Sequence, residues 1–253
     1  MLKLYHAEPA ANSLKSLIPL HEKGLQFASI YVDLHKFEQH QPWFTSINPE
    51  GQVPVLDHDG FIVTHTTVIN EYLEDAFPDA PPLRPNEPKG NARMRYWNKF
   101  VDEHVMNYVS MHGWHRMVGV LARGIESGEF EQMVARIPLH EQREKWKTAR
   151  SGFSEADLAN ATRKIEVAVD KVEDQLGKTP WLAGHMFTLA DINFFAHCGM
   201  AVGRMFPELD VPNRAPRLTE WVERVRARPG VQAALAMPDH TNPALRTFTG
   251  HAR

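Results

Sequence analysis

The sequence predicts an α/β domain with the element order βαβ-ββα, followed by an all-α helical bundle. Up to residue 64, apolar and β-branched residues gather in short runs, as in strands, with one helical segment between them. Beyond residue 90, apolar residues recur at spacings of three and four, as on one face of a helix. A proline-rich stretch typical of a linker separates the two parts and holds Pro78, Pro81, Pro82, Pro85 and Pro88. We therefore expect domains at residues 1–80 and 90–253, joined by a linker at residues 81–89.

The first half of the α/β domain reads as strand, helix, strand. Residues 2–6 alternate between apolar and polar, residues 12–23 have helical spacing and end at Gly24, and residues 27–32 are rich in β-branched and aromatic side chains. A right-handed βαβ unit fits this order. Residues 35–48 show no clear period, so we expect a loop with one or two helical turns.

The second half of this domain is organised around the turn Gly51-Gln52-Val53-Pro54. An Asp-Gly hairpin follows, and a helical pattern begins at Thr66 and stops before Pro78. Pro54 cannot donate a ladder hydrogen bond, and a tight turn is where a cis X-Pro bond is usually found. The backbone of Val53 is then free to pair with an extended peptide, while N–H groups at the start of the Thr66 helix can hold a carboxylate. The implied ligand is a small acidic peptide.

The helical part has clear start signals. Apolar residues from Met94 to Met111 mark a long helix, and Ser154 with Asp157 forms a predicted capping box for the next long one. Thr188 with Asp191 caps a segment that is apolar on most sides and should be a buried central helix; we expect Asp191 to serve folding alone. The tail from Pro238 is rich in Pro, Thr and His, and we expect it to lie across the surface.

Composition excludes several classes of protein. The net charge of −3 with interspersed charges gives no basic stripe, so nucleic acid is not an expected partner. No run approaches the ~18 apolar residues of a membrane span, and the sequence begins directly in a strand pattern, so we expect a cytoplasmic protein. The single cysteine, Cys198, excludes an internal disulfide and is expected to be inert core.

Two strings resemble a known family. Asn-Pro-x-Gly-x-Val-Pro-x-Leu at residues 48–56, followed by Thr-x-x-Ile-x-x-Tyr-Leu at residues 66–73, resembles the glutathione-binding half of cytosolic glutathione transferases. Residues 184–191 resemble the capping-box segment of that family's helical half, so the resemblance covers nearly the whole chain. It implies a thioredoxin-like N-terminal domain, glutathione as co-substrate and a homodimer. Within the family, residues 2–5, 11–15 and 36–40 are similar to bacterial β-etherases that use glutathione to cleave lignin aryl ethers.

Asn12 and Ser13 are the candidate catalytic residues. A thiol has a pKa of about 8.5, and hydroxyl or amide donors at a helix N-terminus favour the thiolate. From the residues alone, either side chain could simply be an N-cap. In the enzymes that this chain resembles, the activating hydroxyl lies at this junction, which makes Ser13 the first choice and Asn12 the second. Tyr5 lies inside a strand, too early in the chain to reach the thiol.

The resemblance also assigns the glutathione contacts. Gln39 and His40 are expected near the glycine carboxylate, Gln52, Val53 and Pro54 along the peptide backbone, and His65 and Thr66 at the γ-glutamyl end. Most relatives have an acidic residue and Ser where this chain has His65-Thr66, so the usual anionic partner of the γ-glutamyl amine is missing. A neutral His65 can accept a hydrogen bond from the amine and a protonated one repels it, which implies weaker or pH-dependent binding. The alternative is that His40 and His65 are ordinary surface histidines.

An aromatic cluster follows the first long helix and suits a hydrophobic aryl substrate: Trp97, Tyr108, Met111, His112, Trp114 and His115. Such a stripe is often core, and we expect about half of it to line a pocket. His112 and His115 have no third ligand in sight, so no metal site is expected.

The sequence thus indicates a glutathione transferase whose thiolate attacks an aromatic substrate and cleaves a β-aryl ether with release of a phenol. Two alternatives stay open among enzymes, a general detoxifying transferase and a glutathione lyase. The non-enzyme alternative is a binding module that keeps the fold without efficient thiol activation.

Overall fold

The computed structural model describes residues 1–240, so most of the tail discussed above lies outside the described residues. Its last described residue, His240, lies on the sheet domain, where its backbone N–H donates to Glu8 and its ring packs 4.4 Å from that of Tyr31. No helix within this range is long and apolar enough to cross a membrane.

The N-terminal domain is built on one four-stranded sheet with the order β2-β1-β3-β4. The strands are β1 (Leu2–His6), β2 (Phe27–Tyr31), β3 (Val55–His58) and β4 (Phe61–Thr64). β1 and β2 are parallel because α1 (Ala11–Glu22) connects them as a crossover, whereas β3 pairs antiparallel with both β1 and β4. The helix α3 (Thr66–Ala76) completes the predicted thioredoxin-like βαβ-ββα order, which is confirmed.

Both faces of the sheet are covered. Leu4 and Leu56 pack with Leu17 of α1 and Leu73 of α3 into the main hydrophobic core. On the other face, Val32, Val55 and Phe44 form a smaller core under α2 (Pro42–Thr45). The segment expected to be loop also holds two short 3-10 turns, η1 (Leu34–Lys36) and η2 (Glu38–His40), before α2. These turns position Gln39 and His40.

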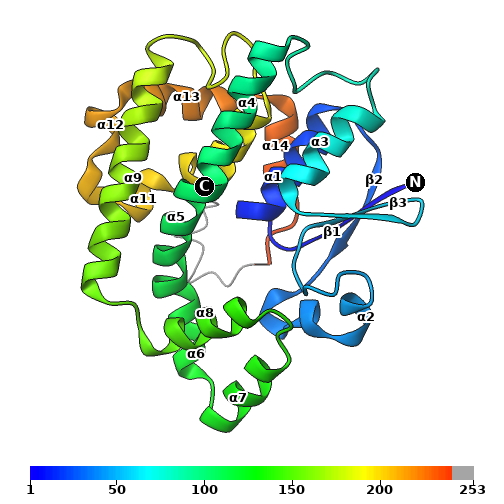
Figure 1. Ribbon diagram of the computed structural model, residues 1–253, viewed down its shortest axis with the longest axis vertical. Coiled ribbons are helices and arrows are strands. Elements are labelled where there is room, and N and C mark those ends of the chain that lie inside the picture. The colour runs from blue at the N-terminus through cyan, green and yellow to red at the C-terminus, as the bar shows by residue number, and fades with distance from the viewer. Residues whose placement is uncertain (241–253) are drawn as a thin grey trace.

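The helical domain begins with one continuous helical segment of residues 88–124 (Figure 1). It comprises α4 (Pro88–Phe100), the π-helical η3 (Val101–Val105), α5 (Met106–Gly113), the π-helical η4 (Trp114–Val118) and α6 (Gly119–Gly124). It starts two residues before residue 90, the expected domain start, because Pro88 suits the first turn of a helix. π-turns insert an extra residue into the helix and are frequent at functional sites.

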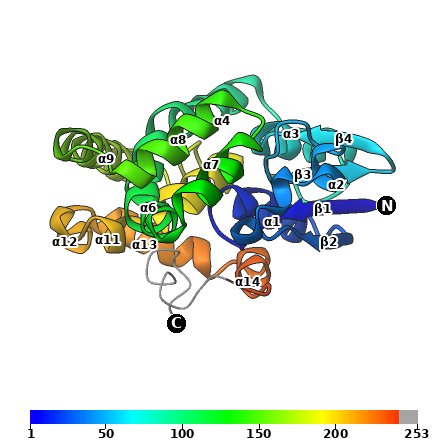
Figure 2. The same ribbon diagram turned by 90° about the horizontal axis from the view of Figure 1, so that it is seen from below.

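The region 119–151 is helical throughout most of its length. After α6 come α7 (Ser127–Ala135) and α8 (His140–Ser151), which form a small core of their own around Ala122, Phe130, Val134 and Ile137. Figure 1 shows this group at the lower end of the molecule, and Figure 2, seen from below, shows it facing the viewer.

The remaining helices surround a buried central one. They are α9 (Glu155–Leu176), α10 (Leu189–Phe194), the π-helical η5 (Phe195–Gly199), α11 (Val202–Met205), the 3-10 turn η6 (Pro207–Leu209), α12 (Val211–Arg214), α13 (Pro216–Arg226) and α14 (Pro229–Leu235). The predicted capping box of Thr188 and Asp191 is confirmed, and the Asp191 carboxylate also accepts from Trp221 Nε1. Burial raises the pKa of Asp191 to about 6. Cys198 is a free thiol that is fully buried, as expected of an inert core residue. Burial raises the pKa of this thiol to about 12.

Ion pairs join the two halves. Lys15 of α1 contacts Asp102 of η3 at 2.9 Å, and Arg228 at the start of α14 donates to Glu22 at the end of α1. Gly230 lets these two helices approach, because a Cβ there would lie 2.7 Å from the Glu22 backbone nitrogen. Lys15 therefore holds the start of α1, where the candidate catalytic residues lie, against the helical domain, and Glu22 holds the other end of α1.

Candidate active site

Ser13 is not an N-cap of α1. The N-cap position is Ala10, which makes no side-chain cap bond. Ser13 is 4% exposed, and its Oγ accepts the Ala7 backbone N–H at 3.0 Å, which closes the loop between β1 and α1. The hydroxyl keeps its own hydrogen for donation. Asn12 lies beside it in the first turn and is exposed. Of the two candidates, Ser13 is the better fixed and Asn12 the more accessible.

The turn before β3 contains a cis Val53-Pro54 peptide bond, where the sequence pattern suggested one. Buried Asn48 holds this turn, since its Nδ2 donates to the Gln52 carbonyl at 2.8 Å and its Oδ1 accepts from the Glu50 N–H at 3.1 Å. Asn48 thus fixes the backbone of the segment expected to pair with a peptide, and sequence reasoning did not give it this role.

Gln39 and His40 lie against this turn. Gly51 has φ +64°, and a Cβ there would lie 2.6 Å from His40 Nδ1, so glycine is required both for the conformation and for the close approach. Gln39 Oε1 and His40 Nδ1 are buried and have no hydrogen-bond partner within the described chain. Burial lowers the pKa of His40 to about 4, so the ring is neutral near pH 7. Orphaned buried polar atoms of this kind fit a polar ligand.

His65 occupies the N-cap of α3 with φ +64° and makes no side-chain cap bond. A non-glycine residue with positive φ in this region is strained, and such strain gathers at functional sites. The imidazole Nε2 lies 3.7 Å from a Glu50 carboxylate oxygen, and both side chains are open to solvent. Thr66, directly after it, begins the helix. Glu50 thus places a carboxylate beside His65 at the start of α3.

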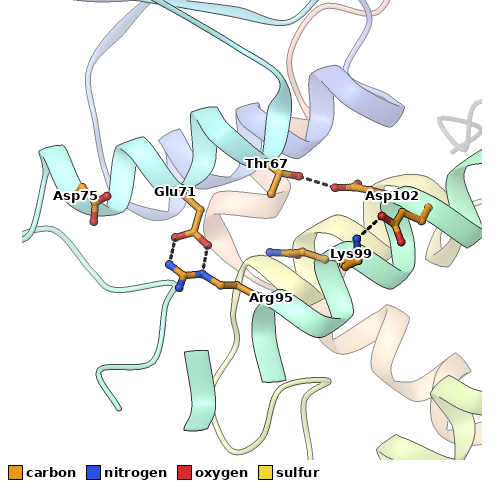
Figure 3. Close-up of a pocket in the computed structure, with 8 residues that line it drawn as sticks. Thr67, Glu71, Asp75, Arg95, Lys99 and Asp102 are labelled. Carbon is orange, nitrogen blue, oxygen red and sulfur yellow. Dashed lines mark hydrogen bonds and ion pairs between the residues drawn. The ribbon is translucent and has the colours of Figure 1, made fainter. Parts of the chain in front are cut away.

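A second carboxylate, that of Asp102, contacts the first turn of α3. Thr67 Oγ1 donates to Asp102 Oδ2 at 2.7 Å (Figure 3). The buried Lys15 ammonium donates to Asp102 Oδ1 at 2.9 Å. Burial works to raise the pKa of Asp102, but the Lys15 charge and the hydrogen bonds hold it below the usual value. These groups border a groove of about 510 Å³ between α3 and α4, lined by Thr67, Glu71, Asp75, Arg95, Asn98, Lys99, Asp102 and Glu103.

Neither Lys15 nor Asp102 was found by sequence reasoning. A signal existed for Lys15, because it interrupts an otherwise apolar helical face, where a charge must find a partner. The partner lies 87 positions later in the chain, and no spacing rule reaches that far.

The predicted substrate residues do not share one location. Trp97, His112 and Trp114 contact the main core, α9 and an aromatic bridge, respectively. Trp97 lies in the main core, with Lys171 over its ring. His112 faces α9, where its Nε2 meets the Leu158 carbonyl at 3.1 Å and the Thr162 hydroxyl at 3.2 Å. Tyr108 is partly buried against the main core. Met111 is half-buried, and His115 is half-buried with its Nδ1 unpartnered within the described chain.

Trp114 belongs to an aromatic bridge, which we define as Trp114, Trp146 and Phe37. The rings of Trp114 and Trp146 are 5.3 Å apart, and Trp146 of α8 lies 5.0 Å from Phe37 of the sheet domain. Phe37 in turn packs 6.0 Å from His40. The bridge therefore joins the helical domain to the predicted glutathione residues.

Within residues 1–240, no group of three or more His, Cys, Asp or Glu side chains could hold a metal ion. The site offers hydroxyl, amide, imidazole and carboxylate groups with an aromatic wall. Such a set can bind a small peptide and hold a thiolate.

Comparison with known proteins agrees with this arrangement. Residues 1–75 match the glutathione S-transferase N-terminal domain and residues 152–224 match the glutathione S-transferase C-terminal domain. The chain is 44% identical to Protein LigF of Sphingobium sp. strain SYK-6 over 235 residues, 91% of each chain. It is 26% identical to glutathione S-transferase 3 of Zea mays over 236 residues, 93% of each.

Solved structures share the fold. The crystal structure of β-etherase LigF from Sphingobium sp. strain SYK-6 superposes with a TM-score of 0.89 at 42% identity, covering 94% of this chain and 99% of that one. A glutathione transferase homologue from sulfitobacter with bound glutathione has a TM-score of 0.62 at 24% identity, with coverage of 92% and 96%. The two matched domains and the likeness to LigF over nearly its full length lead to one conclusion: this protein belongs to the glutathione S-transferase family.

Proposed function

We propose that the chain is a glutathione transferase that cleaves β-aryl ethers. The observation that carries this proposal is the 44% identity to LigF, whose crystal structure is described as that of a β-etherase. Together with family membership, it favours this activity over the two other enzyme classes that the sequence left open.

In this proposal glutathione binds as an extended peptide along the cis-proline turn. The Val53 backbone pairs with the peptide, Gln39 and His40 take the glycine carboxylate with their unpartnered atoms, and Thr66 meets the γ-glutamyl carboxylate. Glu50 lies near His65, and Asp102 binds Thr67. In this proposal these two carboxylates replace the acidic residue that would otherwise bind the γ-glutamyl amine.

Ser13 or Asn12 then holds the sulfur as thiolate at the start of α1. The β-carbon of the ether gains a C–S bond while its C–O bond breaks, and the electron pair leaves with the phenolate oxygen. The aromatic bridge and Met111 hold the aryl rings in line with the sulfur, so the reaction becomes effectively intramolecular.

The test uses a guaiacyl β-aryl ether with and without glutathione, after calorimetry has measured glutathione binding. We expect free phenol only when glutathione is present. A protein that binds glutathione and conjugates simple aryl halides, yet frees no phenol from such ethers, is a general transferase instead. Absence of any binding heat at millimolar glutathione near neutral pH leaves only the non-enzyme alternative.

We further propose that two copies form a homodimer through β4, α3 and α4. The supporting observation is a set of exposed apolar side chains on these elements, Phe61, Ile62, Val68 and Tyr96. They accompany the charged groove between α3 and α4, where Glu71 pairs with Arg95 (Figure 3). A face that combines apolar patches with both charge signs can pair with its own copy about a two-fold axis.

The buried free thiol of Cys198 supports a reducing compartment, which we take to be the cytoplasm.

A further inference from the structure

Lys145 of α8 is a partly buried cation without a counter-ion. Its Nζ donates to Ser110 Oγ at 2.7 Å and lies 4.6 Å above the Trp114 ring. Within residues 1–240 no carboxylate pairs with it, whereas the deeply buried Lys15 and Lys23 face Asp102 and Glu74. A cation taken out of water usually finds a counter-charge.

The surroundings of Lys145 are aromatic. The ammonium lies over the Trp114 ring, which packs against Trp146, the residue after Lys145 in the chain. Phe37 and His40 continue this row of rings toward the proposed glutathione residues. Figure 1 shows α8 at the end of the molecule where the helical domain meets the segment between β2 and β3. An ammonium at the edge of an aromatic wall suits a ligand that is both aromatic and anionic.

The pKa of the Lys145 ammonium is shifted by burial alone. Burial lowers the pKa of Lys145 to about 8, and neither Ser110 nor the neighbouring rings carry a charge that would shift it further. A phenol has a pKa of about 10, by analogy with tyrosine, so proton transfer from this ammonium to a phenolate is downhill. An acid whose pKa lies near neutrality is also well placed for proton transfer at neutral pH.

We infer that Lys145 is the residue that receives the phenolate leaving group of the proposed ether cleavage and protonates it. As the thiolate sulfur bonds to the β-carbon, the C–O electron pair passes to the phenolate oxygen, which takes a proton from the Lys145 ammonium. The resulting amine regains its proton from water. This inference rests on the proposed function for its chemistry, while the anion site itself can be tested without turnover.

The first experiment titrates bound 4-nitrophenol, a phenol whose anion is yellow, on the full chain. A cation within about 4–6 Å should lower the ionisation pH of the bound probe by about one to three pH units. We expect this lowering in wild type and in Lys147→Met, an exposed neighbour paired with Glu144, and its loss in Lys145→Met. Equal ionisation pH in wild type and Lys145→Met overturns the inference, whatever the ether assay gives.

The second experiment varies the leaving group. A general acid contributes roughly a hundredfold or more, so Lys145→Met should slow release of weakly acidic phenols about a hundredfold and leave 4-nitrophenol release and aryl halide conjugation nearly unchanged. Lys145→Arg keeps the charge but cannot give up a proton near neutral pH, so it should retain probe binding and lose most phenol release. Equal slowing with every leaving group would reveal a merely structural lysine. A lowered probe ionisation together with no phenol from any ether would refute the ether proposal and leave the anion site standing.

Discussion

The Lys15 ammonium of the sheet domain lies 2.9 Å from the Asp102 carboxylate of the helical domain. Lys15 is almost wholly buried, while Asp102 keeps about a third of its side chain exposed and has further bonds to Thr67 and Asn193. The two partners are therefore unequal, because only Asp102 has other ways to satisfy its charge.

This inequality predicts unequal effects on stability. Asp102→Asn leaves a buried ammonium without a counter-ion and should lower the free energy of unfolding by roughly 3 kcal/mol, whereas Lys15→Met should cost distinctly less. Burial lowers the pKa of Lys15, so the folded state binds fewer protons than the unfolded one in the pH range between the folded pKa and the unfolded pKa. Stability should then rise with pH as it approaches that value, more steeply in Asp102→Asn. Urea unfolding at several pH values measures both, and equal losses in the two variants would contradict the asymmetry.

Ser13→Ala should affect both rate and stability. Loss of one hydrogen bond to a thiolate is worth about 1.5–3 kcal/mol, which corresponds to about a ten- to hundredfold loss of turnover and a higher apparent thiol pKa. The same change leaves the buried Ala7 N–H unpartnered and should lower the free energy of unfolding by about 1–3 kcal/mol. Asn12→Ala, at an exposed position, serves as the control for stability. If Asn12→Ala carries the rate loss and Ser13→Ala only the stability loss, thiolate stabilisation belongs to Asn12.

His40 predicts a pH dependence of folding. The unfolded ring has a pKa of about 6.5 and the folded one about 4, so between these values the unfolded state binds more protons. Stability should therefore fall as pH is lowered through this window and level off below it. His40→Gln should flatten that part of the curve. The control is His35→Gln, which replaces an exposed histidine and should not flatten it. Thermal unfolding between pH 7 and about pH 4 provides the measurement; identical slopes for wild type and His40→Gln would exclude this role.

The proposed dimer face gives a prediction with a matched control. Phe61 on the edge strand β4 is 61% exposed and Val167 on α9 is 62% exposed. A charge placed in a shared apolar contact must be desolvated, so Phe61→Glu should shift the particle from dimer to the 28.8 kDa monomer. Val167→Glu should leave the assembly unchanged. Sedimentation velocity distinguishes the two, and a wild type that sediments as a monomer would end the dimer proposal.

The local patterns of the sequence determined the elements of this protein. Residues such as Gly24, Pro54 and Thr188 act within a few positions of themselves through φ, a missing N–H or a cap, so their effects can be read along the chain. The same reasoning predicted the βαβ-ββα order, the cis-proline turn and the buried central helix, all of which the structure has. The family followed from motifs of the same short range.

Only the tertiary structure decided which distant groups meet. Ser13 turned out to close a loop by accepting the Ala7 N–H. Trp97 and His112 turned out to contact the main core and α9, whereas Trp114 contacts Trp146. The partners of Lys15 and Lys145 lie 87 and 35 positions away, on other helices. The physical reason is that a helix fixes the spacing of its own side chains, whereas burial, counter-charge and ring packing depend on which faces the folded chain brings together.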